Sequence, residues 1–200
     1  MSVDFAQSET RKNLLRAFAG ESQAKNRYTF SAGFAKKQGL PCVQMVFLFT
    51  ASQEEAHAKA FYDHLKPFAG ENIPIDGAYP IDLYDTVAQH LRAAQHNEYQ
   101  EYEHDYTGFA HTAKEEGFPE ISHLFSQIAR IEQVHGDRFG QFADLIESGK
   151  LFISDVSCQW MCLNCGYIVT AQRPPEQCPV CKHEQGYFVR LEMVPWQMKK

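Results

Sequence analysis

The sequence lacks long hydrophobic runs: no stretch approaches the roughly 18 apolar residues that a membrane-spanning helix needs. Its first residues lack the apolar segment of a secretory signal, so we expect a cytoplasmic protein. No polybasic tract is present and the net charge is −6, which gives no electrostatic footprint for nucleic acid or for a membrane surface. No Gly-x-Gly-x-x-Gly stretch occurs, so no dinucleotide-binding fold is expected.

The composition is that of a globular protein. The chain has 200 residues, of which 44% are hydrophobic, enough for one domain of about 150 residues and a small second module. In a reducing compartment, its six cysteines indicate metal binding more than disulfides.

Two Glu-x-x-His steps, at 54–57 and 132–135, lie within apolar helical stripes, and each follows another Glu at a near-identical distance. Positions i and i+3 of a helix project from one face, so each step offers a carboxylate and an imidazole to the same point. A single such step is usually a solvated face, but two at related positions favour a buried site. Because buried charges are costly unless paired or bound to a cation, the pattern predicts two metal ions. The expected ligands are Glu21, Glu54, His57, Glu98, Glu132 and His135.

An internal repeat relates the two halves of this region. At an offset of 78, residues 28–41 align with 106–119 at seven identities in fourteen positions, including a Gly and a Pro that suit the turn between two helices. The chain therefore predicts a four-helix bundle built from two related hairpins. We expect helices at roughly 8–38, 41–68, 82–116 and 119–148, with a crossover at 69–81.

The repeat slips once, in the third helix. Glu21 to Tyr28 is seven residues, whereas Glu98 to Tyr106 is eight. A single residue inserted into a continuous helix is commonly absorbed as a π-bulge, often at a functional site. We predict one between Glu98 and Tyr106.

A fifth carboxylate lies in the same stretch. Glu101 follows one turn after Glu98 on the same face, whereas its counterpart in the first helix is Ala24. A symmetric pair of metal sites does not need this carboxylate. Glu101 and His57 are therefore the candidates for a ligand exchange that depends on the oxidation state of the metals.

The C-terminal region carries a second metal motif. Cys162-x-x-Cys165 and Cys178-x-x-Cys181 form a four-thiolate pattern, and the turn residues Gly166 and Pro179 let backbone amides approach the sulfurs. The spacing alone suits zinc and iron equally. We expect Trp160, Tyr167 and Phe188 to form the core of this module.

Several other residues fall outside these motifs. Cys42 is expected to be a small core or surface residue, and Cys158 a free thiol. Tyr28 and Tyr106 are as compatible with core aromatics as with a site. The seven remaining histidines lack ligand partners and are expected at the surface or beside the site; they are His64, His90, His96, His104, His111, His123 and His183.

The motifs together resemble the rubrerythrin family over essentially the whole chain. The matching stretches are AGESQAKNRY at Glu21, EEAHA at His57, NEYQE at Glu98, EQVH at 132–135, and WMCLNCGY with CPVC. The resemblance implies an all-α ferritin-like four-helix bundle with a non-haem diiron site over 1–150. It also implies a rubredoxin-like domain over 157–200 that holds one iron by four cysteines, which favours iron over zinc and gives three Fe per chain.

The resemblance also implies roles for single residues. Glu54 and Glu132 resemble bridging carboxylates, while Glu21 resembles a terminal ligand of one iron and Glu98 and His135 those of the other. Family behaviour implies that Glu101 and His57 exchange at the first iron on a change of oxidation state, and that Tyr28 and Tyr106 lie beside the site. The family often has Met before the second tyrosine and Pro after it, where this chain has Asp105 and Thr107, and this leaves the shape of the third helix open.

The function implied by the resemblance is reduction of hydrogen peroxide to water in protection against oxidative stress. The candidate catalytic residues are Glu101, His57, Tyr28 and Tyr106. The implied electron donor is a separate NAD(P)H-linked reductase or rubredoxin, and the implied assembly is a head-to-tail homodimer or a larger homo-oligomer.

Two alternatives remain open at this point. A ferritin-like ferroxidase or iron-binding protein would use similar bundle ligands. A non-enzymatic scaffold with a zinc ribbon would need no diiron centre.

Overall fold

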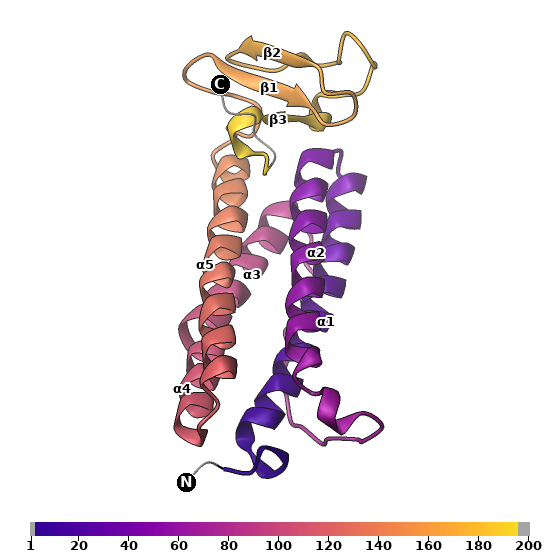
Figure 1. Ribbon diagram of the computed structural model, residues 1–200. Coiled ribbons are helices and arrows are strands. Elements are labelled where there is room, and N and C mark those ends of the chain that lie inside the picture. The colour runs from indigo at the N-terminus through magenta and orange to yellow at the C-terminus, as the bar shows by residue number, and fades with distance from the viewer. Residues whose placement is uncertain (1–2, 196–200) are drawn as a thin grey trace.

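The computed structural model describes residues 3–195, which form a helical bundle with a small β-sheet at one end (Figure 1). The helices are α1 (Glu9–Lys37), α2 (Pro41–Asp63), α3 (Val87–Gln100), α4 (Tyr106–Glu116) and α5 (Pro119–Glu147). A π-helical segment, Glu101–Asp105, joins α3 to α4, so these two form one interrupted helix and the bundle has four helical rods. Within residues 3–195, none of the helices combines the length and the apolar character needed to cross a membrane.

The rods pack as two hairpins, as the repeat predicts. Helix α1 lies along α2, and α3 and α4 lie along α5, whereas α2 and α5 touch only slightly (Figure 1). The turn of each hairpin uses a left-handed glycine, Gly39 with φ 74° and Gly117 with φ 91°, and the next helix begins at Pro41 or Pro119. Only glycine adopts such a φ without steric cost, and proline is favoured in a first helical turn.

The crossover between the hairpins is longer than predicted. Helix α2 ends at Asp63 instead of residue 68, and a 3₁₀ turn at Lys66–Phe68 contains Pro67, which has no amide to donate and disfavours helix before it. Helix α3 begins at Val87 instead of residue 82. Thr86 caps it: its Oγ1 accepts from the Gln89 amide at 3.2 Å, while Gln89 Oε1 accepts from the Thr86 amide at 3.1 Å. The predicted range 69–81 is therefore wrong, and the crossover spans 64–86.

The apolar core of the bundle is divided into two clusters. One surrounds Phe47, Leu91 and Phe139 near the sheet, and the other surrounds Phe61 and Phe125 toward the far end. The buried glutamates and histidines predicted as ligands belong to neither cluster. The hydrophobic effect therefore packs the bundle on both sides of a polar layer.

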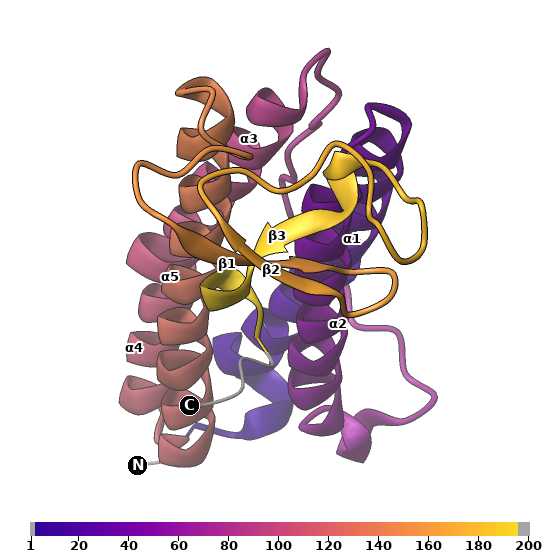
Figure 2. The same cartoon turned by 90° about the horizontal axis from the view of Figure 1, so that it is seen from above.

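The C-terminal module is a three-stranded antiparallel sheet in the order β2-β1-β3. Its strands are β1 (Cys158–Cys162), β2 (Ile168–Ala171) and β3 (Phe188–Arg190). Trp160 and Phe188 are fully buried in its core and Tyr167 is partly buried, as expected. The indole Nε1 of Trp160 donates to the Ala171 carbonyl at 3.0 Å. The sheet lies across the end of the bundle (Figure 2); residues 196–200 of the predicted range 157–200 lie outside the described residues.

A close backbone approach holds this module against the bundle. A Cβ atom added at Gly186 would lie 2.0 Å from the Gly39 carbonyl oxygen and 3.0 Å from Pro41 Cδ. Any side chain at Gly186 therefore has to push the module away from the turn between α1 and α2.

We expect Gly186→Ala to lower the free energy of unfolding by about 1–3 kcal/mol, because the backbone has to move to accommodate the methyl group. The free energy can be measured by urea unfolding, and cleavage between the bundle and the sheet by limited proteolysis. The matched control is Gly108→Ala on the exposed face of α4, where an added Cβ meets open space. Equal stability of the two variants would contradict the predicted clash.

Candidate metal centres

Four helices bring the predicted bundle ligands to one buried layer. Within the described part of the bundle, two groups offer ligand atoms that all lie within 4.8 Å of one another. The first group is Glu21, Glu54, His57 and Glu132, and the second is Glu54, Glu98, Glu132 and His135. Glu54 and Glu132 belong to both groups, so the arrangement has two metal positions that share two carboxylates.

The distances repeat across the two positions. His57 Nδ1 lies 3.1 Å from Glu54 Oε2 and 3.0 Å from Glu132 Oε1. His135 Nδ1 lies 3.0 Å from Glu54 Oε1 and 2.9 Å from Glu132 Oε2. Each shared carboxylate thus turns one oxygen toward each imidazole, as a bridging ligand does.

The other two glutamates occupy equivalent end positions. Glu21 Oε1 lies 3.8 Å from His57 Nδ1, and Glu98 Oε2 lies 3.7 Å from His135 Nδ1. Their roles as terminal ligands, which the resemblance implies, stay a prediction.

Most of the ligand atoms lack hydrogen-bond partners although they are buried. Both oxygens of Glu54 and Glu132, one oxygen each of Glu21 and Glu98, and Nδ1 of both histidines lie close to one another, but among the described residues none of them makes a hydrogen bond of good geometry. A buried polar atom without a partner is costly, so these atoms fit a cation better than an apoprotein core. Four carboxylates carry about four negative charges, which two divalent ions would balance, and carboxylate with imidazole is a common iron ligand set in helical bundles.

The pKa values reflect the charges crowded into this layer. Burial and the neighbouring carboxylates raise the pKa of Glu21 and Glu98 well above the usual range. Burial also acts to raise the pKa of Glu132, but the two imidazoles outweigh it and lower that pKa to about 2. Burial acts to lower the pKa of both histidines, whereas the carboxylates raise it to about 9 for His57 and about 12 for His135. The metal-free layer therefore holds protons where metal ions would bind.

The two tyrosines lie beside this layer and cross between the hairpins. The Tyr106 hydroxyl donates to Glu21 Oε1 at 2.5 Å, and the Tyr28 hydroxyl donates to Glu98 Oε1. Each tyrosine thereby orients the terminal glutamate of the other hairpin.

The predicted π-bulge is confirmed, as the segment Glu101–Asp105. Glu101 is partly buried and lines a cavity beside Tyr106, and burial with the nearby carboxylates raises its pKa well above the usual range. In the described chain the first ligand group contains His57 and not Glu101. The exchange of these two ligands stays a prediction.

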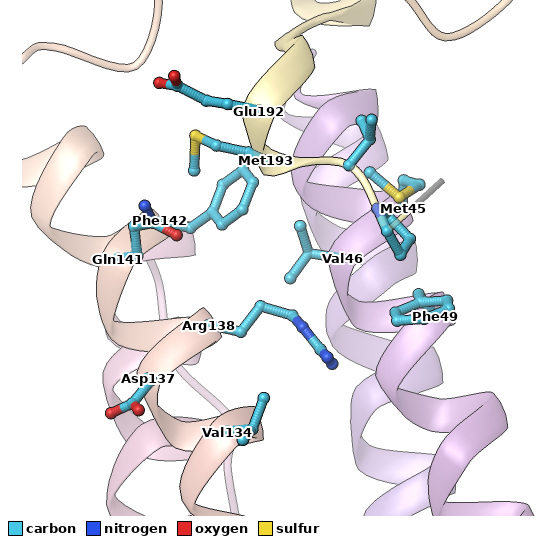
Figure 3. Close-up of a pocket in the computed structure, with 12 residues that line it drawn as sticks. Met45, Val46, Phe49, Val134, Asp137, Arg138, Gln141, Phe142, Glu192 and Met193 are labelled. Atoms are coloured by element: carbon cyan, nitrogen blue, oxygen red, sulfur yellow. The ribbon is translucent and has the colours of Figure 1, made fainter. Parts of the chain in front are cut away.

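Two buried or half-buried side chains make contacts that were not anticipated. Arg138 reaches from α5 toward α2 (Figure 3), where Nη1 donates to Thr50 Oγ1 at 2.9 Å and to Gln53 Oε1 at 3.0 Å. Its spacing of three residues from His135 was the available signal. His90, expected at the surface or beside the site, is instead buried between Ser31 Oγ and the Tyr84 carbonyl, each at 3.0 Å from a ring nitrogen.

The four cysteines of the C-terminal motif converge on a second centre. Cys162 Sγ lies 3.7 Å from Cys181 Sγ, and Cys165 Sγ lies 3.6 Å from Cys178 Sγ. Sulfurs at 2.3 Å from a central ion in a tetrahedron are about 3.8 Å apart, so the group fits one tetrathiolate metal.

Two similar turns build this centre. A left-handed residue follows the second cysteine of each pair, Gly166 with φ 77° and Lys182 with φ 63°. Lys182, not Pro179, therefore plays the part of Gly166 in the second turn. The backbone amide of His183 lowers the pKa of Cys181 to about 6, which favours the thiolate that a metal binds.

The other two cysteines lie apart from this group. Cys42, expected to be a core or surface residue, is buried in the bundle core. Burial raises its pKa to about 12. Cys158 begins β1 and packs against the module core without joining the four ligand cysteines.

We expect metal binding in the bundle to release at least about two protons per chain at neutral pH, because metals replace protons on His57 and His135, whose pKa values the carboxylates raise to about 9 and about 12. The apparent affinity for Co²⁺ should therefore fall as the pH falls. Titration calorimetry in two buffers of different ionisation enthalpy measures the proton count, once zinc has filled the tetrathiolate. The exposed control His111→Gln should release as many protons as the natural chain, and a heat independent of the buffer would contradict the prediction.

Comparison with known proteins places this geometry in a family. The family model described as "Rubrerythrin" matches residues 12–143, and that described as "Rubrerythrin, rubredoxin-like domain" matches 160–189. Rubrerythrin of Porphyromonas gingivalis is 43% identical over 94% of this chain and 92% of its own length. Rubrerythrin of Nitratidesulfovibrio vulgaris is 40% identical over 92% and 95%.

Solved structures agree with the fold. A mixed-valence nigerythrin has a TM-score of 0.62 at 27% identity and covers 94% of this chain and 91% of its own. A Desulfovibrio desulfuricans bacterioferritin has a TM-score of 0.64 at 20% identity over 71% and 82%, which shows the ferritin-like fold alone. The bundle residues and the four cysteines are consistent with three Fe per chain. The chain belongs to the rubrerythrin family, whose members are iron-dependent oxidoreductases.

Proposed function

We propose that this protein reduces hydrogen peroxide to water at a diiron site in the bundle, with electrons delivered through an iron–tetrathiolate centre in the C-terminal module. Residues 1–150 would form the diiron domain and 157–200 the electron-transfer domain. The observation that carries the proposal is the presence, in one chain, of two adjoining carboxylate–imidazole sites with unpartnered buried atoms and a four-cysteine centre. An iron store would need the first site but not the second.

The bound irons would supply the electrons, since a diferrous pair can give the two electrons that convert peroxide and two protons into two waters. The protein has to supply the protons. Glu101 lines a cavity beside the site, and burial with the nearby carboxylates raises its pKa well above the usual range, which favours the protonated carboxyl. Glu101 is therefore the proposed proton donor to the departing oxygen.

Glu101 could also offset the positive charge that the site gains when the metals are oxidised. The four other glutamates balance a diferrous pair, whereas oxidation to a diferric pair adds about two positive charges. A fifth carboxylate, once deprotonated, would offset part of that increase. This gives a physical reason for the proposed exchange of His57 for Glu101.

The tyrosines hold the ends of the site. Tyr28 donates to Glu98 Oε1, which leaves Glu98 Oε2 turned toward His135. Tyr106 donates to Glu21 Oε1, the oxygen that also lies near His57, and leaves Glu21 Oε2 without a hydrogen-bond partner among the described residues. The two tyrosines are therefore proposed to orient ligands during turnover.

The distance between the two centres favours an oligomer. Helix α5 continues from His135 to Glu147, about 18 Å along its axis, before the chain reaches the C-terminal module. A head-to-tail homodimer would bring one chain's tetrathiolate closer to the other chain's diiron site. An NAD(P)H-linked reductase or rubredoxin in the cytoplasm is the proposed donor.

The face between α2 and α5 is the proposed dimer surface. Val134 is exposed there, and with Met45 and Phe49 it lines a cavity of about 570 Å³ that Figure 3 shows. Exposed apolar side chains grouped on one face are typical of a surface that another protein covers.

We expect the reduced protein, given stoichiometric peroxide without oxygen, to regain the visible absorption of its oxidised tetrathiolate rapidly, because the diiron site draws electrons from that centre. Stopped-flow absorption measures the rate. Glu101→Gln should slow the recovery by about tenfold or more while iron content stays unchanged, because the proton donor is lost. Slow recovery accompanied by uptake of added ferrous iron would support a ferroxidase instead.

A second variant tests electron delivery through the tetrathiolate separately from the reaction at the diiron site. Cys165→Ser should remove the tetrathiolate absorption and leave the two bundle irons in place. Steady-state peroxide turnover with an external donor should then collapse. Undiminished turnover in Cys165→Ser would contradict the proposed electron route.

We expect Val134→Glu to shift the protein toward monomers, because it places a charge in the proposed dimer surface. Sedimentation velocity over a range of concentrations measures the shift. Val156→Glu changes a similarly exposed valine outside the bundle and should leave the oligomer intact. Dissociation of both variants, or of neither, would argue against the α2–α5 face.

A further inference from the structure

A cavity of about 260 Å³ lies beside the Glu21 end of the diiron layer. Its walls are α1, the crossover at 76–80, and the stretch of α3, π-helix and α4 that contains Glu101 and Tyr106. Tyr106 donates to Glu21, so the inner wall of the cavity touches a proposed ligand directly. Through Glu101 and Tyr106, the cavity reaches the half of the site proposed to change ligands.

Two ion pairs join the crossover to α1 beside this cavity. Arg27 pairs with Asp82, both nearly buried, and Asn97 Nδ2 donates to the same Asp82 oxygen at 3.1 Å. Arg16 pairs with Asp76 at 2.6 Å, but Asp76 is 88% exposed. Exposed ion pairs contribute little stability, so the Asp82 end is held firmly and the Asp76 end weakly.

Tyr79 lies between these two ion pairs and covers the cavity. Its ring folds back over Gly77, where an added Cβ would meet ring atoms at 3.1 Å. Its hydroxyl donates to the Arg16 carbonyl at 3.3 Å, a long hydrogen bond. The Tyr79 side chain, which covers the cavity, is therefore held mainly by this long hydrogen bond and by the exposed Arg16–Asp76 ion pair next to it.

Gly20 sets the width of the gap beneath this cover. A Cβ added at Gly20 would lie 3.9 Å from both Tyr79 Cε1 and Tyr106 Oη. One methyl group would thus touch the cover on one side and the tyrosine of the site on the other. A side chain at Gly20 would therefore occupy the space between Tyr79 and Tyr106.

We propose that this cavity is the route by which small hydrogen-bonding species, the oxidant among them, reach Glu101 and the metal positions beside it, and that Tyr79 with Gly20 determines the size of hydroperoxide admitted. The inference rests on the proposed function. A volume of about 260 Å³ is below the roughly 300–1,000 Å³ of pockets that bind drug-sized ligands. The side-chain amides of Gln23, Asn97 and Gln100 on its walls offer partners to a polar peroxide and none to a bulky alkyl group.

The variants follow from this geometry. Tyr79→Ala removes the cover, and Tyr79 is 43% exposed, so the fold should survive. Gly20→Ala narrows the gap at ordinary contact distance and suits a helix. Tyr84→Ala is the matched control, because Tyr84 lies in the same crossover and is 41% exposed but does not line this cavity.

The first measurement compares reduced holoprotein reacting with hydrogen peroxide and with cumene hydroperoxide by stopped flow. Tyr79→Ala should raise the relative rate with cumene hydroperoxide by about tenfold, and Gly20→Ala should lower it by a similar factor, with smaller effects on hydrogen peroxide. Tyr84→Ala should match the natural chain. Equal selectivity in all four proteins would overturn the proposal.

The second measurement does not depend on turnover. The rate of Co²⁺ uptake by the metal-free bundle, followed by visible absorption with zinc in the tetrathiolate, should rise in Tyr79→Ala and fall in Gly20→Ala at unchanged final stoichiometry. Uptake rates equal to those of the natural chain and of Tyr84→Ala would overturn the route. If the natural chain shows no peroxide reaction but uptake still depends on Tyr79 and Gly20, the proposed function fails and the route stands.

Discussion

The structure depends on neutralising a layer of buried carboxylates. Glu21, Glu54, Glu98 and Glu132 lie between two apolar clusters, where an uncompensated ion costs several kcal/mol. Protonated imidazoles and raised glutamate pKa values offset part of this cost in the metal-free chain, but most ligand atoms still lack partners. Bound cations would complete the layer, so the same ions would serve stability and chemistry.

The π-helical segment makes a nearly symmetric scaffold asymmetric. The repeat places a ligand glutamate and a tyrosine on each hairpin, and each tyrosine donates to the other hairpin's glutamate. The extra residue in Glu101–Asp105 lets both Glu98 and Tyr106 face the layer while Glu101 turns toward the cavity. Its counterpart, Ala24, is buried in the apolar core. Only one side of the layer therefore has a spare carboxylate beside a covered cavity.

The sequence predicts the features that are governed by local spacing. The ligand positions, the glycine–proline turns and the π-helical segment all follow from intervals within one or two helices. The long crossover was missed at both ends, although Pro67 and the Thr86–Gln89 capping box are local signals. Other features depend on contacts between distant segments. The His90 ring is buried where it meets Ser31 and the Tyr84 carbonyl, and Arg138 of α5 donates a hydrogen bond to Thr50 of α2. The spacing of residues within one helix cannot predict contacts of this kind.

The turn between α1 and α2 contacts the C-terminal module and so helps to fix the tetrathiolate centre relative to the bundle. Gly39 ends α1 like its repeat partner Gly117, but its carbonyl also lies against Gly186 of the C-terminal module. Cys181 lines a cavity with Gly39, so that edge of the tetrathiolate faces its own bundle, whereas Cys165 is exposed. The exposed edge is the one that another molecule can approach closely. With about 18 Å of α5 beyond His135 in the same chain, the exposure of Cys165 suits the proposed electron exchange with a second protein better than one with the chain's own diiron site.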